Sequence, residues 1–546
     1  MTGIAVAAIA LLTAVMLPRF VSVGRFESGF EAMEQWLRRY GAWAAAVSSI
    51  AVVWFVWGEI LPTAKIQDES SYLLQSHIFA SGRWTIPSPP IPEFFEQPHV
   101  LVVPAVASKY PPGHALLLSI GSLVRFPPLV PLLLAGVTAW LLFALALRVS
   151  NAWVALLTWL LWATASITLR FQSSYLSEVT TGALMLASWW CLLEWRDTRA
   201  RRWLLLLALA IGWSAITRPL TSLAIAVPIG VVVLLDTVRQ RGWKDLGLAV
   251  GVGVAVLAIL PLWSAQTTGD WREWPVERYR VDYIPWDKPG FTADSTPPRR
   301  AGSAVIQSMT SYFLQAHAEH TPAALPGIVS RRVLNLATGF FQNLRLPLLV
   351  FAIAGLFAMP RAAAFALGTA LLHFAAYVMY AHDPYWTAYY LETAPAVAML
   401  VALGLWRAAR WAARGDVRAP LGAVAALGVL VAIGAPAVRD WRADHAIRSA
   451  FDRRFARSLT EVEAPAIVFL RYSPRLAIHP SVVFNRLDPE RAPVWVVHDL
   501  GARNAELLRL APERRGYRID EGELLRWAVD ERPRPLPLRA LAPAAP

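Results

Sequence analysis

The sequence predicts an α-helical polytopic membrane protein that carries a small α/β domain at its C-terminal end. Hydrophobic residues make up 56% of the 546 residues and charged residues only 16%, with a mean hydropathy of +0.43. A soluble protein of this size is less apolar. Apolar runs of roughly 15 to 22 residues also recur, close to the roughly 20 residues that cross a bilayer as a helix.

About eleven or twelve helices are expected to span the membrane. The predicted spans are residues 41–62, 127–147, 152–169, 177–195, 203–216, 220–235, 246–264, 346–357, 362–380, 389–406 and 420–435. Residues 4–17 form a further apolar stretch, which lacks both a basic segment before it and a clear small-residue cleavage site. We interpret it as an extra span or a signal-anchor-like helix rather than a cleaved signal.

The net charge of +13 is explained by basic residues in the loops between predicted spans, and it does not indicate nucleic-acid binding. Basic residues gather in alternate loops, which the positive-inside rule makes cytoplasmic; they include Arg38, Arg148, Arg196, Arg361 and Arg407. The segments around residues 66–112, 170–175, 266–345 and 381–388, and everything after residue 437, then face outward. Cys191 is the only cysteine, so the chain has no intramolecular disulfide and no multi-cysteine metal site.

The chain is expected to divide into three parts. Residues 1–40 form an N-terminal helix and a cytoplasmic segment, and residues 41–436 form the transmembrane block with external loops at 66–112 and 266–345. Residues 437–546 form a C-terminal periplasmic α/β domain. This domain has strand-length apolar runs at 466–470, 481–484 and 494–497 and a helical pattern at 504–510, and residues 517–519 are expected to form a further strand. It contains no Gly-rich nucleotide-binding motif.

Both external loops are expected to be ordered. In the first, a helical pattern ends before the proline-rich stretch 87–92, which cannot continue a helix. Residues 113–124 are apolar and end before Pro127-Pro128, which favours an in-plane helix at the outer surface. The second loop is rich in aromatic and charged residues, including Tyr279, Tyr283, Trp286 and Asp287. We interpret it as an ordered lid at the membrane interface; the alternative is an aromatic belt without a role in chemistry.

The acidic pair Asp68-Glu69 opens the first external loop. Taken alone, the pair is explained by helix capping, because Asp is a preferred N-cap and acidic side chains suit the first turn of a helix. Its neighbours in the sequence point to a second interpretation.

Ordered motifs in the first loop resemble those of GT-C glycosyltransferases, in the branch of the protein O-mannosyltransferases, the aminoarabinose transferases and the Rgt-type sugar transferases. The motifs are Asp68-Glu69-Ser70-Ser71-Tyr72, Ala80-Ser81-Gly82-Arg83-Trp84 and Lys109-Tyr110-Pro111-Pro112-Gly113. Further similarities are Ser174-Tyr175-Leu176-Ser177-Glu178, Thr217-Arg218-Pro219 and Tyr389-Tyr390-Leu391-Glu392. The resemblance covers most of the transmembrane block. One departure is Tyr110, which separates Lys109 from the proline pair, where the aminoarabinose branch has Lys directly before Pro.

The resemblance implies an inverting transferase that moves a sugar from a polyprenyl-phosphate carrier to an acceptor hydroxyl on the outer face. Asp68 and Glu69 are then the catalytic residues, since a positioned carboxylate can take the proton of an attacking hydroxyl. Lys109 and Arg218 would bind the donor phosphate. The alternatives are a snorkelling lysine and an arginine that binds a carbonyl at a helix end.

Four more residues are candidates for substrate binding: Tyr72, Glu178, His382 and Tyr390. Glu178 equally fits a simple charge at a helix N-terminus, and the aromatic residues equally fit an interfacial belt. His382-Asp383 is too small a set to indicate a metal site. No cofactor is certain, and a divalent metal is left open because the requirement varies among GT-C relatives.

Two other functions stay open at this stage: a transporter or flippase, and a membrane-anchored assembly protein of envelope glycans. Transporters place ionisable groups near the middle of spans, whereas the suspect charges here gather on one face. The expected partners are a lipid-linked sugar donor, a lipid, glycan or protein acceptor, and membrane lipids. The Ala- and Arg-rich composition suits a bacterial inner membrane, with the active site on the periplasmic face. The sugar, the acceptor and the oligomeric state are not specified by the sequence.

Overall fold

The computed structural model describes residues 2–20, 27–291, 296–414, 418–473, 481–530, 532 and 534–541. Parts of the predicted second loop (292–295), of the transmembrane block (415–417) and of the C-terminal segment (474–480) lie outside this description. The chain forms two compact units. The first unit is Met1–Glu59, Val130–Leu257 and Ala323–Ala443, and the second is Ile60–Leu129, Ala258–Pro322 and Asp444–Pro546. The first loop, most of the second loop and the C-terminal segment thus belong to one unit, and the expected boundary at residue 40 falls inside a helix.

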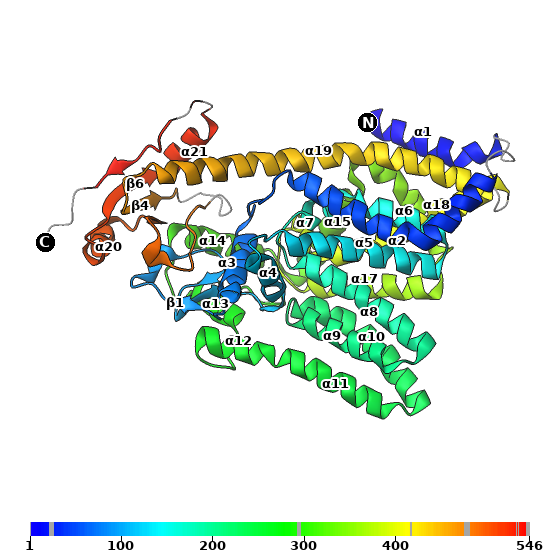
Figure 1. Cartoon of the computed structure of the whole chain (residues 1–546), viewed down its shortest axis with the longest axis horizontal. Helices are drawn as coiled ribbons and strands as arrows, with labels where there is room; N and C mark the ends of the chain where they lie inside the picture. Colours follow the sequence, from blue (N-terminus) through cyan, green and yellow to red (C-terminus); the bar gives the residue numbers. More distant parts are fainter. Residues whose placement is uncertain are drawn as a thin grey trace. The chain divides into compact units, whose positions relative to one another are not determined.

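The first unit is a bundle of helices (Figure 1). They are α1 (Thr2–Met16), α2 (Glu27–Trp57), α5 (Leu129–Val149), α6 (Ala152–Ala163), α7 (Ser166–Gln172), α8 (Glu178–Thr198), α9 (Arg201–Ala215), α10 (Pro219–Gln240), α11 (Trp243–Leu257), α15 (Leu325–Arg345), α16 (Leu349–Leu356), α17 (Arg361–Val378), α18 (Ala394–Ala413) and the start of α19 (Ala419–Thr460). Neighbours in sequence often pack together, as α8 with α9 and α9 with α10. Only two or three residues connect these helices, and connections this short favour antiparallel neighbours.

The chain is a polytopic helical membrane protein, as predicted, but the number of spans differs. In the described part of the chain, seven helices are long and apolar enough to cross a membrane, or up to nine if two bent pairs each count as one span. The expected spans at 177–195 and 203–216 are not among them. The helix α8 carries Glu178 and Glu194, and α9 has only 15 residues. The expected span 346–357 is also too short alone and qualifies only together with α15, which was assigned to the external loop.

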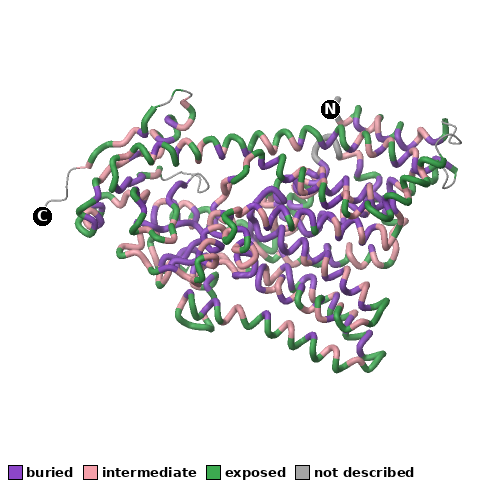
Figure 2. The backbone as a smooth tube through the Cα atoms, in the orientation of Figure 1, coloured by how far each residue is buried: buried purple, intermediate pink, exposed green. Residues whose placement is uncertain are grey.

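Exposure along the helices matches a lipid environment. The candidate span Leu129–Val149 is 72% buried within the protein, whereas Trp243–Thr268 is only 17% buried. Figure 2 shows α11 largely exposed, and its exposed side chains include Leu248, Val250 and Val254. Exposed aliphatic side chains on a helix this apolar fit hydrocarbon as the surrounding solvent.

Glycine allows close backbone packing of α16 against α18. A Cβ atom on Gly404 would collide with the backbone carbonyl of Phe351, and a Cβ on Gly355 would collide with that of Leu400. Small residues of this kind let membrane helices approach until their backbones touch, which increases van der Waals contact where lipid offers no hydrophobic driving force.

The second unit contains a small antiparallel sheet and several helices. Its first part comprises α3 (Gln67–Ala80), β1 (Ile86–Pro87), β2 (Val100–Leu101), β3 (Ala105–Ser108) and α4 (Gly113–Leu123). Strand β3 pairs with both β1 and β2. Helix α12 (Ile259–Thr268) leads from the predicted span 246–264 into the second loop, which contains α13 (Pro275–Tyr283) and α14 (Ala304–Ala318). The described residues of both loops thus form regular structure.

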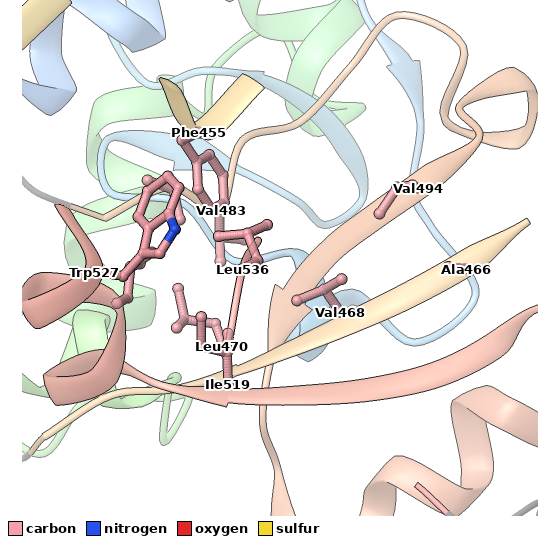
Figure 3. Close-up of a cluster of buried hydrophobic side chains, with 11 residues drawn as sticks. Phe455, Ala466, Val468, Leu470, Val483, Val494, Ile519, Trp527 and Leu536 are labelled. Atoms are coloured by element: carbon pink, nitrogen blue, oxygen red, sulfur yellow. The ribbon is translucent and has the colours of Figure 1, made fainter. Parts of the chain in front are cut away.

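The C-terminal segment is the predicted α/β structure. Strands β4 (Ala466–Arg471), β5 (Val494–His498) and β6 (Arg515–Asp520) form a parallel sheet in the order β5-β4-β6, and β7 (Arg539–Ala540) adds an antiparallel edge. Helices α20 (Asn504–Leu510) and α21 (Glu521–Val529) complete it. Figure 3 shows Val468, Leu470 and Ile519 of the sheet packed with Phe455 and Trp527. Ile467 and Phe469 are buried on the other face, which explains the continuous apolar run of β4.

One predicted strand, 481–484, is wrong. Val482 and Val483 are buried in the same core as the sheet, but the segment pairs with no strand. Its backbone is bound by side chains instead: the carbonyl of Ser481 accepts from Gln67 at 3.0 Å, and the amide of Val482 donates to Tyr472 at 3.1 Å. Burial alone therefore produced the apolar pattern that was interpreted as a strand.

The contact between α16 and α18 yields a stability test. Gly404→Ala should lower stability by about 1–3 kcal/mol, because the added methyl group overpacks a backbone contact. Thermal unfolding of the purified protein in detergent measures the change. Gly428→Ala is the matched control, since a Cβ there meets nothing within 4 Å. Equal unfolding temperatures for the two variants would contradict the backbone contact.

Candidate functional site

Asp68 lies in the first turn of α3 but does not cap it. The N-cap residue is Ile66, which makes no side-chain cap, and Asp68 and Glu69 follow inside the helix. The alternative in which Asp68 is the N-cap residue is therefore wrong, but the acidic first turn that it included is present. Both carboxylates lie favourably at the positive end of the helix dipole. The helix presents the two side chains differently. Asp68 is 28% exposed, whereas Glu69 is buried and accepts a hydrogen bond from the amide of Lys65 at 3.3 Å.

The side chains of Tyr110 and His99 contact the Asp68 carboxylate. The hydroxyl of Tyr110 donates to Oδ1, and Nε2 of His99 lies 3.4 Å from Oδ2. Tyr72 supports this arrangement because its ring stacks on Tyr110, with ring centroids 4.7 Å apart, and meets His114 edge-on. The residue that interrupts the Lys-Pro pattern, Tyr110, thus contacts the proposed base directly.

His99 is a site residue that sequence reasoning missed. It is buried and has a φ of 66°, a left-handed conformation that is uncommon for a residue with a Cβ. Its amide donates to the hydroxyl of Tyr279 at 2.9 Å, and its carbonyl accepts from Ser71 at 2.8 Å and from the amide of Lys109 at 3.0 Å. Such a conformation persists only where neighbours determine it, and it is enriched at functional sites. A single His between Pro98 and Val100 gave no signal in the sequence.

Lys109 places a buried ammonium group in the same unit. Its Nζ lies over two aromatic rings, 5.2 Å from the centroid of Tyr110 and 4.8 Å from that of Tyr279. Burial lowers the pKa of Lys109, and the negative charges of Asp287 and Asp68 oppose this shift. Among the described residues, no carboxylate lies within ion-pair distance of this ammonium. The two aromatic rings and the more distant carboxylates therefore stabilise the charged form of Lys109 without forming an ion pair with it. The ammonium group can still bind an anionic ligand.

Residues of the second loop form part of the surroundings of Lys109 and contact the first loop. Tyr279 lies on α13, and Asp287 follows it and lies 3.3 Å from His317 of α14. Tyr283 donates to Glu96 of the first loop at 3.1 Å. Burial and the charge of Glu96 raise the pKa of Tyr283, so its hydroxyl stays protonated and donates. The aromatic residues of this loop thus bind the first loop and do more than form a belt.

A separate polar network lies in the first unit around Arg218, the N-cap residue of α10. Its guanidinium forms an ion pair with Glu178, lies 3.7 Å from Glu392, and donates to Tyr377 at 2.8 Å. Glu392 is buried and also accepts from Thr181. Arg218 is therefore already balanced by two carboxylates, and the predicted site residues Glu178 and Arg218 are direct partners.

His382 and Tyr390 are also partners in the first unit. Nε2 of His382 lies 2.8 Å from the hydroxyl of Tyr390. Beside them, the buried Arg332 donates to the carbonyls of Tyr377 and Tyr380 at 2.8 and 2.7 Å. Arg332 lies in the segment assigned to the second loop and was not recognised as a site residue. The two terminal nitrogens of its guanidinium, Nη1 and Nη2, donate to backbone carbonyls, which fits a structural role.

The residues give no support for a metal site. In the described part of the chain, no group of three or more His, Cys, Asp or Glu side chains is placed to hold a metal ion. We therefore assign no metal ligand and derive no step through a metal.

Comparisons with known proteins identify the fold. No protein-family model matches the chain, and no curated protein matches its sequence. Two solved structures of ArnT from Cupriavidus metallidurans are similar to it. The one bound to undecaprenyl phosphate has a TM-score of 0.52 and 16% identity, and the apo one has a TM-score of 0.50 and 17% identity. Each match covers 90% of this chain and 95% of the other.

At this identity the similarity concerns the fold, and it extends over both compact units. ArnT is an aminoarabinose transferase, from one of the branches that the first-loop motifs resemble. The predicted architecture, a helical membrane block followed by a small strand-containing segment, is confirmed. The chain therefore has the fold of these ArnT structures, which is the GT-C fold that the first-loop motifs predicted.

Proposed function

We propose that this protein is a membrane glycosyltransferase that moves a sugar from a polyprenyl-phosphate-linked donor to an acceptor hydroxyl on the outer, periplasmic face of a bacterial inner membrane, with inversion. The observation that carries the proposal is the Asp68 carboxylate, which is partly exposed and held by Tyr110 and His99 in the same unit as the buried cation of Lys109. The GT-C fold and the undecaprenyl phosphate bound to the structurally similar ArnT support it.

The proposed reaction is a displacement at the anomeric carbon. The acceptor oxygen bonds to this carbon while its proton passes to the Asp68 carboxylate, which acts as general base. The bond from the carbon to the donor phosphate breaks, and its electron pair stays on the phosphate oxygen. The charge that develops there is stabilised by the ammonium of Lys109, since a fixed cation in a water-poor site costs no reorganisation. Attack opposite the leaving phosphate inverts the configuration.

The remaining predicted residues receive supporting roles. Tyr110 orients the Asp68 carboxylate, and Tyr72 holds the ring of Tyr110. Glu69 is buried and bound to a backbone amide, so we assign the proton transfer to Asp68. Arg218 stays a predicted phosphate ligand; its pairing with Glu178 and Glu392 means that a phosphate would have to compete with two carboxylates.

The base assignment predicts that Asp68→Asn reduces kcat by roughly 10²–10⁴-fold, because the amide cannot accept the proton. Transfer of a radiolabelled sugar from a polyprenyl-phosphate donor to a membrane extract as acceptor measures it. Glu69→Gln, which alters the neighbouring carboxylate, is expected to lose much less. Unchanged transfer by Asp68→Asn would rule out Asp68 as the base.

Tyr110→Phe tests the orienting hydroxyl. The ring that stacks on Tyr72 is kept and only the donor to Asp68 is lost, so we expect a fall in kcat of about tenfold, the value of one hydrogen bond to a charged group. KM for the donor should change little. A normal kcat would show that Tyr110 does not position the base.

The pH profile tests Lys109. Burial lowers the pKa of Lys109, so the ammonium is present below this lowered value and is lost as the pH rises through it. Donor binding should therefore weaken on the alkaline side, seen as a rise in KM. In Lys109→Arg the cation persists to higher pH, and the alkaline loss should move upward. Lys288→Arg is the matched control, and an identical alkaline limb in both variants would exclude Lys109 as the titrating cation.

A further inference from the structure

A cavity of about 420 Å³ lies among the helices of the first unit. It is lined by α5, α8, α10, α17 and α18, of which α8, α10 and α17 pack side by side (Figure 1). Its walls are almost entirely apolar, with side chains such as Leu142, Leu145, Leu186, Phe365 and Met399. This volume falls within the range of roughly 300–1,000 Å³ that small-molecule sites occupy.

The cavity is elongated along the helices that line it. Helix α8 contributes lining residues from Leu186 to Arg196. At a rise of about 1.5 Å per residue these residues extend over roughly 15 Å of the helix axis. A slot of this shape suits an acyl chain.

One end of the cavity is basic. Arg196 and Arg361 are the two charged side chains in its lining. Arg196 forms an ion pair with Asp236 at 3.0 Å, whereas Arg361 is exposed and, among the described residues, forms no ion pair. Arg361 is also the first residue of α17, where amide groups without helical acceptors and the helix dipole favour an anion. Both arginines fall on the face that the positive-inside rule makes cytoplasmic.

From this combination we propose that the cavity binds an anionic phospholipid, with one acyl chain in the apolar slot and the headgroup phosphate on Arg361, assisted by Arg196. Arginine binds phosphate oxygens in bidentate fashion, and basic pockets between membrane helices on the cytoplasmic side are suited to anionic headgroups. This site is independent of the proposed transfer reaction. Its ligand is a structural or regulatory lipid and not the sugar donor.

The test uses the purified full chain in micelles with palmitoyl-oleoyl phosphatidylglycerol or palmitoyl-oleoyl phosphatidylcholine as probe. Native mass spectrometry counts bound lipid, and thermal unfolding reports stabilisation. The wild type should retain phosphatidylglycerol in preference to phosphatidylcholine, and its Tm should rise. Arg361→Gln should bind phosphatidylglycerol about tenfold more weakly. Arg239→Gln, an exposed arginine outside the lining, should bind as the wild type does.

A larger side chain in the apolar cavity tests whether the acyl chain binds there. Ala366→Phe places a ring in the cavity and should reduce retention of phosphatidylglycerol, whereas Ala364→Phe on the same helix lies outside the lining and should not. Equal retention of both lipids by the wild type would overturn the proposal. The same holds for equal losses in Arg361→Gln and Arg239→Gln, and for displacement of phosphatidylglycerol by undecaprenyl phosphate, which would make the cavity a site for the donor chain.

Discussion

The second unit has to bury the charged ammonium group of Lys109, and this constraint decides which side chains surround it. Removing a lysine charge from water is costly unless nearby groups compensate. Here the compensation comes from the rings of Tyr110 and Tyr279 and from the charges of Asp68 and Asp287. Tyr279 and Asp287 belong to the second loop, while Asp68, Lys109 and Tyr110 belong to the first. The cation is therefore surrounded by side chains from both loops.

His99 contacts both Lys109 and Asp68, the first through its backbone and the second through its ring. Its amide is bound by Tyr279, its carbonyl receives the amide of Lys109, and its ring approaches Asp68. One residue in a left-handed conformation therefore sets the positions of the base and the cation. Strain at such a residue is sustained only by a well-packed surrounding, and here the surrounding is made of side chains from both loops. Contacts within the protein alone thus hold Asp68, His99 and Lys109 next to one another.

The sequence predicts features that have a local pattern, such as apolar helices and ordered motifs. It does not predict contacts between residues that are far apart along the chain. Apolar length predicted the membrane helices, and the first-loop motifs predicted the GT-C fold. The contacts of Asp68 with His99, and of His99 with Tyr279 180 residues away, have no local pattern. Segment 481–484 was misassigned because burial without strand pairing gives the same apolar run. Charges such as Glu178 and Glu194 made α8 less apolar than a simple count of hydrophobic residues suggested.

In the proposed mechanism, the ammonium group of Lys109 binds the phosphate of a lipid-linked donor. The most direct measurement is the Kd of undecaprenyl phosphate for the purified protein and for Lys109→Met, a variant of similar length without charge. We predict that the variant binds at least about tenfold more weakly, as expected when a charged hydrogen-bond donor is removed from a phosphate, while its thermal stability is kept. Equal affinities in the two proteins would contradict the account.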